Sequence, residues 1–222
     1  MKNVTHDEVS CIIFDSDGTL VDTLDIIVAG YNYAVEPVLG KKFSEAEVSA
    51  LFGPPMKRIL ANVLPPSGVE DAVNRYHTFY RQHFHDRARV YPGILDVLKT
   101  IQKSGIKMGV LTGAGRVAAE VTLQSARLSK FFPTLVTGDD VASPKPDPQG
   151  LLMAIAQIGE PSSKTVYVGD NVVDLEAAKR SGAASAAALW GSRHRDDIKM
   201  WNPKYVLHEP SQILETMVSA TE

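Results

Sequence analysis

The chain has 222 residues, a formal net charge of −3 and 44% hydrophobic residues. This length accommodates one α/β core with a small insertion, and the composition is that of an ordinary globular protein. The negative charge argues against nucleic acid as a partner, and no apolar run is long enough to predict a membrane span. The first ten residues do not resemble a targeting signal, and the single cysteine, Cys11, favours a reducing compartment; we therefore expect a cytoplasmic protein.

The first predicted strand, an apolar run over residues 11–14, leads into the segment Asp15-Ser16-Asp17-Gly18-Thr19. In an extended chain, residues two apart point to the same side, so Asp15 and Asp17 can converge while Gly18 permits a turn. Two neighbouring carboxylates repel, so either one keeps a proton with a raised pKa or a divalent cation lies between them. Phosphoester hydrolysis uses both arrangements, because it needs a nucleophile, an acid and a metal.

A calcium-binding loop is one alternative explanation of this segment. Such a loop requires glycine at its sixth position and an acidic residue at its twelfth, but counting from Asp15 these positions hold Leu20 and Ile26. The spacing therefore argues against calcium binding. A polar turn without a catalytic role remains an alternative for the segment taken alone, since Asp, Ser and Gly are common turn residues.

Residues 21–88 have a mainly helical pattern, in which apolar residues such as Leu24, Ile27 and Val28 recur on one face. The proline pairs at 54–55 and 65–66 predict that this region is divided into short helices. A further helix is predicted over 94–104, and strand patterns follow it. We therefore expect residues 1–20 and 89–222 to form the core and residues 21–88 to form an insertion.

Two of the later strand-like runs end in groups that suit a phosphate. Residues 106–111 lead to Thr112 and Gly113, whose hydroxyl and amide can bind phosphate oxygens at the start of a helix. Residues 135–137 lead to a loop in which two prolines flank Lys145 and stiffen the backbone around its ammonium group. Taken singly, Thr112 is an ordinary helix cap and Lys145 an ordinary solvated charge.

The last such run, residues 165–169, leads to Asp170 and Asp174. Their i, i+4 spacing predicts two carboxylates on one face of an opening helix, although a cap and a first-turn acid would have the same spacing. In open parallel α/β sheets, ligands bind beyond the carboxyl ends of the strands, where all four segments place their polar groups. We therefore predict an α/β fold with a doubly wound, mostly parallel, Rossmann-like sheet.

The order Asp-x-Asp-Gly-Thr, Thr, Lys and Gly-Asp-x-x-x-Asp resembles the haloacid dehalogenase superfamily of phosphohydrolases over nearly the whole chain. The likeness is closest to its phosphoglycolate phosphatase and beta-phosphoglucomutase-like branch. The resemblance implies that residues 21–88 form a small α-helical cap, which closes over the site, excludes water and selects the substrate.

The resemblance also implies roles for single residues. Asp15 would be the nucleophile that forms an aspartyl-phosphate, and Asp17 the general acid that later activates water. Thr112 and Lys145 would hold the transferred phosphoryl group. The implied cofactor is Mg²⁺, and its implied ligands are two aspartate carboxylates and a backbone carbonyl, supported by one further aspartate: Asp15, Asp170, the carbonyl of Asp17 and, in support, Asp174.

The expected substrate is a small anionic phosphorylated metabolite, with phosphoglycolate first and pyrophosphate or a sugar-phosphate mutase reaction as alternatives. We expect Thr19 and Gly113 to contact it, and Lys57 or Arg58 in the predicted cap loop to bind an anionic leaving group, although both cations are equally ordinary solvated charges. Relatives often carry Asn where this chain has Gly113, which leaves one phosphate contact in doubt. A monomer or a homodimer is expected.

Two patterns suggest other classes of protein. Residues 113–118 fit the G-x-G-x-x-A pattern of dinucleotide-binding proteins, but that pattern belongs in the first βα turn and leaves Asp15, Lys145 and Asp170 unexplained. A phospho-accepting receiver domain also uses an Asp cluster, a Thr and a Lys, but its chain is much shorter. We therefore expect an enzyme that hydrolyses phosphoric monoesters.

Overall fold

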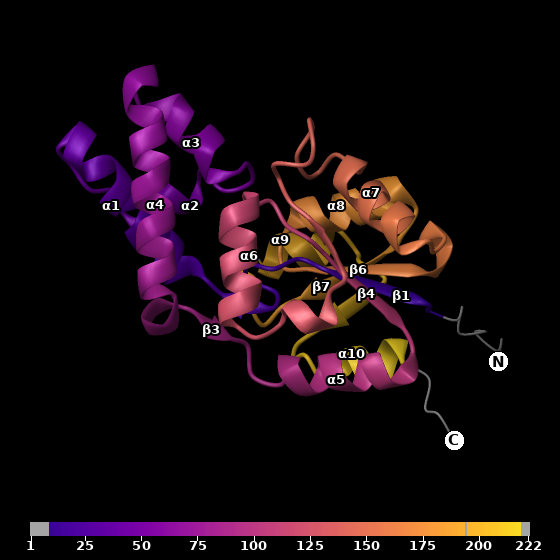
Figure 1. Cartoon of the computed structure of the whole chain (residues 1–222). Coiled ribbons are helices and arrows are strands. Elements are labelled where there is room, and N and C mark those ends of the chain that lie inside the picture. Colours follow the sequence, from indigo (N-terminus) through magenta and orange to yellow (C-terminus); the bar gives the residue numbers. More distant parts are fainter. Residues whose placement is uncertain (1–8, 194, 219–222) are drawn as a thin grey trace, which may run out of the picture.

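The computed structural model describes residues 9–193 and 195–218. Its centre is a six-stranded sheet in the order β5-β4-β1-β6-β7-β8, in which every neighbouring pair is parallel (Figure 1). The predicted doubly wound α/β sheet is therefore confirmed. Its strands are β1 (Cys11–Phe14), β4 (Lys107–Leu111), β5 (Thr134–Val136), β6 (Thr165–Gly169), β7 (Ala184–Ala188) and β8 (Tyr205–Leu207).

Helices cover both faces of this sheet. On one face lie α7 (Gln149–Ile158) and α8 (Val172–Ser181), and on the other lie α5 (Ile94–Ser104) and α10 (Gln212–Met217) (Figure 1). The core is completed by α6 (Arg116–Ser125), α9 (Arg195–Met200) and the 3₁₀ turns η1 (Ser129–Phe131) and η2 (Ser162–Lys164).

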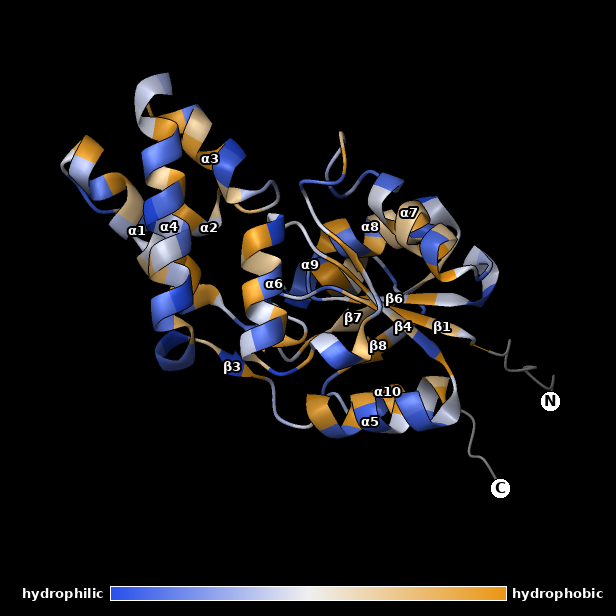
Figure 2. Cartoon of the chain, viewed as in Figure 1, coloured by the Kyte–Doolittle hydropathy of each residue, from blue (hydrophilic) through white to orange (hydrophobic). Residues whose placement is uncertain are grey.

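The central strand β1 is buried from both sides. Ile12 and Phe14 join the apolar cluster on one face, whereas Cys11 and Ile13 join the cluster on the other. A strand covered on both faces has no polar positions, which is why this segment is a continuous apolar run in the sequence (Figure 2).

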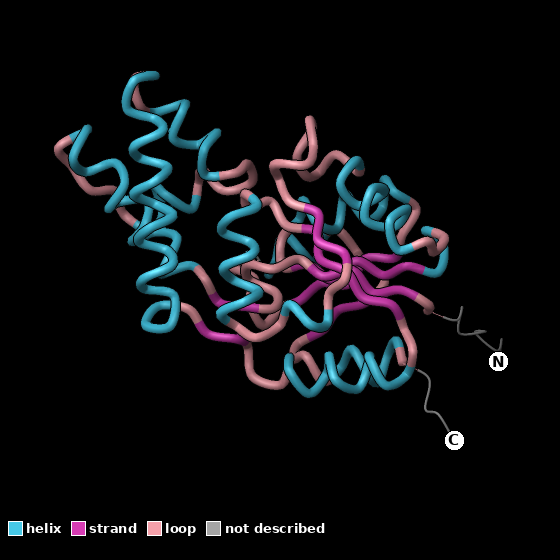
Figure 3. The backbone as a smooth tube through the Cα atoms, in the orientation of Figure 1, coloured by secondary structure: helices cyan, strands magenta, loops and turns pink. Residues whose placement is uncertain are grey.

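Four helices that follow β1, within residues 24–87, lie beside the sheet, at one side of the molecule (Figure 3). They are α1 (Leu24–Leu39), α2 (Glu45–Ser49), α3 (Met56–Val63) and α4 (Pro66–Arg87). The chain enters and leaves them through β2 (Val21–Asp22) and β3 (Arg89–Val90), which pair antiparallel.

The lengths of these helices depart from the prediction in one place. The proline pair at 65–66 does not leave a short helix after it, because α4 begins at Pro66 and continues for 22 residues. Proline is tolerated in the first helical turn, where its missing N–H has no partner to lose. The predicted helix over 94–104 is confirmed as α5.

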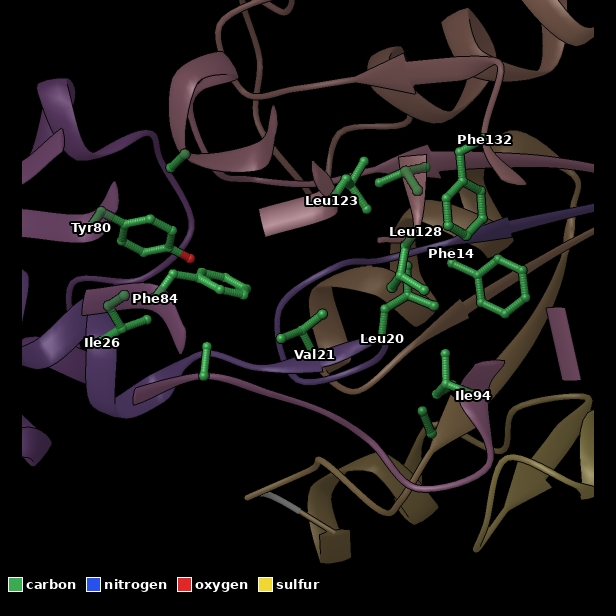
Figure 4. Packing of buried hydrophobic residues seen from close by; sticks show 14 of the residues in the cluster. Phe14, Leu20, Val21, Ile26, Tyr80, Phe84, Ile94, Leu123, Leu128 and Phe132 are labelled. Atoms are coloured by element: carbon green, nitrogen blue, oxygen red, sulfur yellow. The ribbon is translucent and has the colours of Figure 1, made fainter. Parts of the chain in front are cut away.

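The four helices share apolar packing with the core. Tyr80 and Phe84 from α4 belong to the same buried cluster as Leu123 from α6 and Phe14 from β1 (Figure 4). The Tyr80 hydroxyl also lies 2.9 Å from the hydroxyl of Thr122 on α6. The insertion is thus packed against α6. Among the described residues, no helix combines the length and the apolar character that crossing a bilayer requires.

Candidate active site

A cleft of about 790 Å³ lies between the carboxyl end of the sheet and the helical insertion. Most of the polar residues predicted at the strand ends line it. These residues come from four separate segments of the chain and are Asp15, Asp17, Thr112, Gly113, Lys145, Asp170 and Asp174. The parallel arrangement of β1, β4 and β6 brings their ends to this one edge, as expected.

The innermost part of the cleft is a charged cluster around Lys145. Its ammonium nitrogen lies 3.0 Å from Asp15 Oδ2 and 2.6 Å from Asp174 Oδ1. It also donates to the hydroxyl of Tyr167, at 3.2 Å. Burial alone would lower the pKa of Lys145, but the two carboxylates outweigh it and hold that pKa well above its usual range. Lys145 is therefore a fixed positive charge beside Asp15.

Asp15 is the carboxylate at the end of β1, and only 7% of the residue is exposed. Burial raises its pKa to about 7; Lys145 opposes the rise, while Asp174 and Asp17 add to it. Its Oδ1 accepts the backbone N–H of Ser16 at 2.8 Å, and its Oδ2 faces Lys145. Both oxygens are thus oriented by neighbouring donors, as a nucleophile requires.

Asp17 lies in the turn that follows and has a different environment. Its Oδ1 accepts the hydroxyl of Thr23 at 2.7 Å. Burial raises the pKa of Asp17, while the hydroxyl of Thr23, the charge of Lys145 and the hydroxyl of Thr112 lower it. Asp17 is therefore suited to hold a proton more readily than an exposed aspartate, which a general acid needs.

Asp170 and Asp174 do not share the face of a helix, contrary to the prediction. Helix α8 begins at Val172, and its N-cap is Asn171, which forms a capping box with Asp174. Asp170 lies before the helix, against Gly18, where a Cβ atom would approach the carboxylate to 2.4 Å. Because Asn171 supplies the cap, the side chain of Asp170 is left to point toward Asp15.

The structure also changes the interpretation of Asp174 and Thr19. Asp174 is fully buried, with Oδ1 bound to Lys145 and Oδ2 bound to the N–H of Asn171 at 3.0 Å. Thr19, expected to contact substrate, is also fully buried; its hydroxyl donates to Asp170 Oδ1 at 3.2 Å. Thr19 therefore orients Asp170 from behind and does not line the cleft.

The aspartates form a site that fits a divalent cation. Asp15, Asp170 and Asp174 each offer a carboxylate oxygen, and these oxygens lie within 4.8 Å of one another. Burial raises the pKa of Asp170 well above its usual range, and the charges of Asp174 and Asp15 add to the rise. An all-oxygen, carboxylate-rich site of this kind suits Mg²⁺, which would relieve this repulsion.

The loop before α3 approaches the strand ends directly. A Cβ atom on Gly113 would lie 2.5 Å from the carbonyl oxygen of Gly53. While the loop is in this position, there is therefore no room for a side chain at position 113, including the Asn that the resemblance leads one to expect there.

The two cations predicted for substrate binding occupy different places. Lys57 lines the cleft, but its ammonium group pairs with Glu70 at 2.6 Å. Arg58 does not line the cleft: its guanidinium donates to the carbonyl of Val141 at 3.0 Å and that of Ala142 at 3.5 Å. The expectation that Arg58 binds the leaving group is therefore corrected, because adjacent helical residues point in different directions.

A carboxylate side chain of the protein already binds the G-x-G-x-x-A segment. The N–H of Arg116, at the start of α6, donates to Asp139 Oδ2 at 2.8 Å. This carboxylate occupies the helix end that a pyrophosphate would need in a dinucleotide-binding protein. The structure therefore argues against that alternative.

Two residues of the site were missed in the sequence. Thr23 binds Asp17, and Tyr167 lies beneath Lys145, with its hydroxyl 3.1 Å from the carbonyl oxygen of Leu111 and 3.2 Å from Asp174 Oδ1. Tyr167 carries a hydroxyl group within the mainly apolar strand β6, and this hydroxyl is its signal in the sequence. Thr23 lies at a helix start, where a threonine is unremarkable.

The chain is similar to known hydrolases over most of its length. A family model described as haloacid dehalogenase-like hydrolase matches residues 12–188. The pyrophosphatase PpaX of Bacillus velezensis is 28% identical over 95% of this chain and 97% of its own length. PpaX of Halalkalibacterium halodurans is 29% identical, covering 94% and 96%.

Solved structures show the same fold. A predicted phosphoglycolate phosphatase from Haemophilus somnus superposes with a TM-score of 0.83, at 21% identity, over 93% of this chain and 96% of that one. CbbY from Rhodobacter sphaeroides, in complex with phosphate, superposes with a TM-score of 0.81, at 21% identity, over 94% and 99%.

Proposed function

Since the chain belongs to the haloacid dehalogenase-like hydrolase family, we propose that it is a Mg²⁺-dependent phosphatase that forms an aspartyl-phosphate on Asp15. One observation carries the proposal. The buried Asp15 carboxylate lies at the inner end of the cleft, 3.0 Å from Lys145 and beside the carboxylates of Asp170 and Asp174. This arrangement supplies a nucleophile and the positive charge that a phosphoryl group needs in one place.

The proposed reaction has two halves. Asp15 attacks the phosphorus atom, and Asp17 gives its proton to the leaving oxygen. Asp17 then removes a proton from the water that attacks the aspartyl-phosphate, which releases phosphate and restores Asp15. The hydroxyl of Thr23 holds Asp17 in place at 2.7 Å. Lys145 and the hydroxyl of Thr112 are the groups that we assign to the phosphoryl oxygens.

Asp15, Asp170 and the carbonyl of Asp17 are the proposed Mg²⁺ ligands. When bound, the ion would neutralise phosphate charge and polarise the phosphorus centre. Asp174 is a weaker candidate for direct ligation, since its oxygens already accept from Lys145 and Asn171. We assign to it mainly the fixing of Lys145.

Residues 21–88 are proposed to act as the cap. The loop that contains Gly53 is the part of this cap that lies against Gly113, next to the proposed phosphoryl site. Such a cap keeps bulk water from the aspartyl-phosphate. Phosphoglycolate and pyrophosphate are the first substrates to test, since proteins named for their hydrolysis are similar to this chain. A sugar-phosphate mutase would share the first half-reaction.

The test is phosphate release with Mg²⁺ and with EDTA, comparing the wild type with Asp15→Asn. We expect Asp15→Asn to lower kcat by about 10⁴-fold or more, since the covalent step is lost. Asp96→Asn, an exposed aspartate on α5, is the matched control and should keep normal turnover. Substantial activity in folded Asp15→Asn, or activity indifferent to EDTA, would refute the proposal.

A further inference from the structure

The wall of the cleft on the side of the helical insertion is mainly apolar. It is formed by α3, α4 and the loop before α3, and its side chains include Phe52, Pro54, Pro55, Met56, Ile59 and Val73. Phe52 is 43% exposed, although it is a large aromatic residue. An exposed aromatic residue inside a cleft is available to cover an apolar part of a ligand.

The cleft is also larger than a small dianion requires. Its volume of about 790 Å³ lies in the upper part of the range of about 300–1,000 Å³ that is typical for drug-sized ligands. Phosphoglycolate and pyrophosphate are far smaller than such ligands. Either would leave the apolar wall uncovered.

The charges on this side do not favour a second anionic group. Among the described residues that line the cleft, the basic side chains are Lys57, Lys145 and Arg193. Lys145 belongs to the aspartate cluster, Lys57 pairs with Glu70 at 2.6 Å, and Arg193 pairs with Glu45 at 2.5 Å. The acidic side chains of the lining outside the aspartate cluster are Asp22, Asp25, Glu45 and Asp139, of which Asp25 pairs with Arg87 and Glu45 with Arg193, so that Asp22 and Asp139 remain without an ion pair in the part of the chain that the structure describes. A carboxylate or a second phosphate would therefore meet net negative charge and would have to displace an existing ion pair.

The remaining polar groups on this side are neutral. Ser49 lines the cleft, but its Oγ is buried and has no hydrogen-bond partner within the described part of the chain, so it is not accessible to a ligand. His77 also lines the cleft, and burial lowers its pKa, with Arg81 adding to the effect and Asp139 opposing it. A neutral imidazole can bind a hydroxyl or a carbonyl oxygen, but it supplies no positive charge at neutral pH.

We propose that the preferred substrate is a phosphomonoester with an uncharged leaving group that carries an apolar body, which packs against Phe52 and Met56. This inference rests on the proposed function, because it concerns the leaving group at the same site. It places compounds of this class ahead of phosphoglycolate and pyrophosphate as substrates.

The first experiment is a series of alkyl phosphates, with ethyl, butyl and hexyl phosphate compared under saturating Mg²⁺. Their leaving alcohols have similar reactivity, so the series isolates the contribution of the apolar body. Each buried methylene should raise kcat/KM about three- to fourfold, so burial of all four added methylenes gives about 80- to 250-fold from ethyl to hexyl phosphate. Phosphoglycolate and pyrophosphate should fall below butyl phosphate.

A pair of cap variants locates the effect. Phe52→Ala should lower the ratio of kcat/KM for hexyl and ethyl phosphate by about fivefold, since part of the covering surface is removed. Tyr33→Ala is the matched control, because Tyr33 is an exposed aromatic residue of the same four helices that does not line the cleft. That ratio should stay at the wild-type value in Tyr33→Ala.

The outcomes separate this inference from the proposed function. A flat or falling series, or a clear preference for phosphoglycolate or pyrophosphate, overturns the inference while Asp15-dependent hydrolysis still stands. An equal loss of chain-length preference in both variants also overturns it, because Phe52 would then have no specific part. If none of these compounds were hydrolysed in an Asp15-dependent way, the proposed function itself would fail.

Discussion

The ion pairs on the two sides of the cleft differ in how far they are buried. On the sheet side, Lys145 and Asp174 pair with only 9% and 0% of their side chains exposed. On the helical side, Lys57 and Glu70 pair with 60% and 68% of their side chains exposed. Exposed ion pairs contribute little to stability, whereas loss of one partner of a buried pair is costly. The comparison indicates that the charges on the sheet side are held in fixed positions, whereas a charge on the helical side can be removed at little cost in stability.

Among the variants that test this difference between the two sides, Asp17→Asn should cause the largest fall in kcat. The proton for the leaving oxygen is then missing, so we expect kcat to fall by about 10²- to 10⁴-fold. Rapid-quench detection of the phosphoenzyme, together with steady-state phosphate release, measures this. Thr23→Val should act in the same direction but more weakly, because it only frees the Asp17 side chain. A normal kcat in Asp17→Asn would remove Asp17 from the mechanism.

Tyr167→Phe tests whether the buried charge cluster depends on its hydroxyl. The change removes one partner of Lys145 and leaves the carbonyl of Leu111 without its donor. We expect a loss of about 1–3 kcal/mol in the free energy of unfolding and a fall in kcat of about tenfold, with KM little changed.

Tyr80→Phe is the control for Tyr167→Phe. Its buried hydroxyl also has a partner, Thr122, and neither of these two residues lines the cleft. A similar loss of stability with a smaller loss of kcat would support a positioning role for Tyr167. If both variants lost the same activity, the hydroxyl of Tyr167 would be merely structural.

Gly113→Ala should create a steric clash between the sheet side and the helical side of the cleft. The added Cβ atom would lie 2.5 Å from the carbonyl oxygen of Gly53, so the cap loop must move away from the site. We expect kcat/KM to fall about tenfold with only a modest change in melting temperature. Gly68→Ala adds a methyl group where the nearest atom is 3.9 Å away, and its kinetics should match the wild type.

The pH dependence of stability tests the sheet side without substrate. Because the pKa of Asp15 is raised to about 7 in the folded chain, the folded state binds more protons than the unfolded state between about pH 4 and 7. The metal-free protein should therefore lose stability as pH rises through this window, by a few degrees in melting temperature.

The same measurement of melting temperature against pH should be repeated with Mg²⁺ and with the Asp15→Asn variant. Mg²⁺ should raise the melting temperature more at pH 8 than at pH 5, because it binds the ionised carboxylates of the folded state. Asp15→Asn should make the pH profile of the metal-free protein less steep, while the raised pKa values of Asp17 and Asp170 maintain part of the slope. An identical slope in wild type and variant would assign the effect to other groups.

The smallest effect is expected from Glu45→Gln, which breaks the exposed pair with Arg193. We expect KM to change by less than about fivefold and kcat to remain close to normal. Michaelis–Menten curves for one alkyl phosphate and for phosphoglycolate measure it. A loss as large as that of Asp17→Asn would mean that the helical side carries chemistry as well.

The site on the sheet was predictable because each of its residues follows an apolar run. Runs such as residues 11–14 and 165–169 can only be buried strands, and parallel strands connected by helices bring their carboxyl ends to one edge. Asp15, Thr112, Lys145 and Asp170 were therefore found together. The helix over 94–104 was predicted for a similar reason, since its apolar period is local.

The sequence by itself thus determined the sheet, the family and the residues at the strand ends, because these depend on local patterns and on spacing along the chain. Only the tertiary structure decided how distant segments use their polar atoms. In the folded chain, the Arg58 guanidinium donates to the carbonyl of Val141, the Asp174 carboxylate pairs with Lys145, and the Gly53 loop lies against Gly113. Hydrogen bonds and close contacts of this kind depend on side-chain direction in three dimensions, which no periodicity in the sequence records.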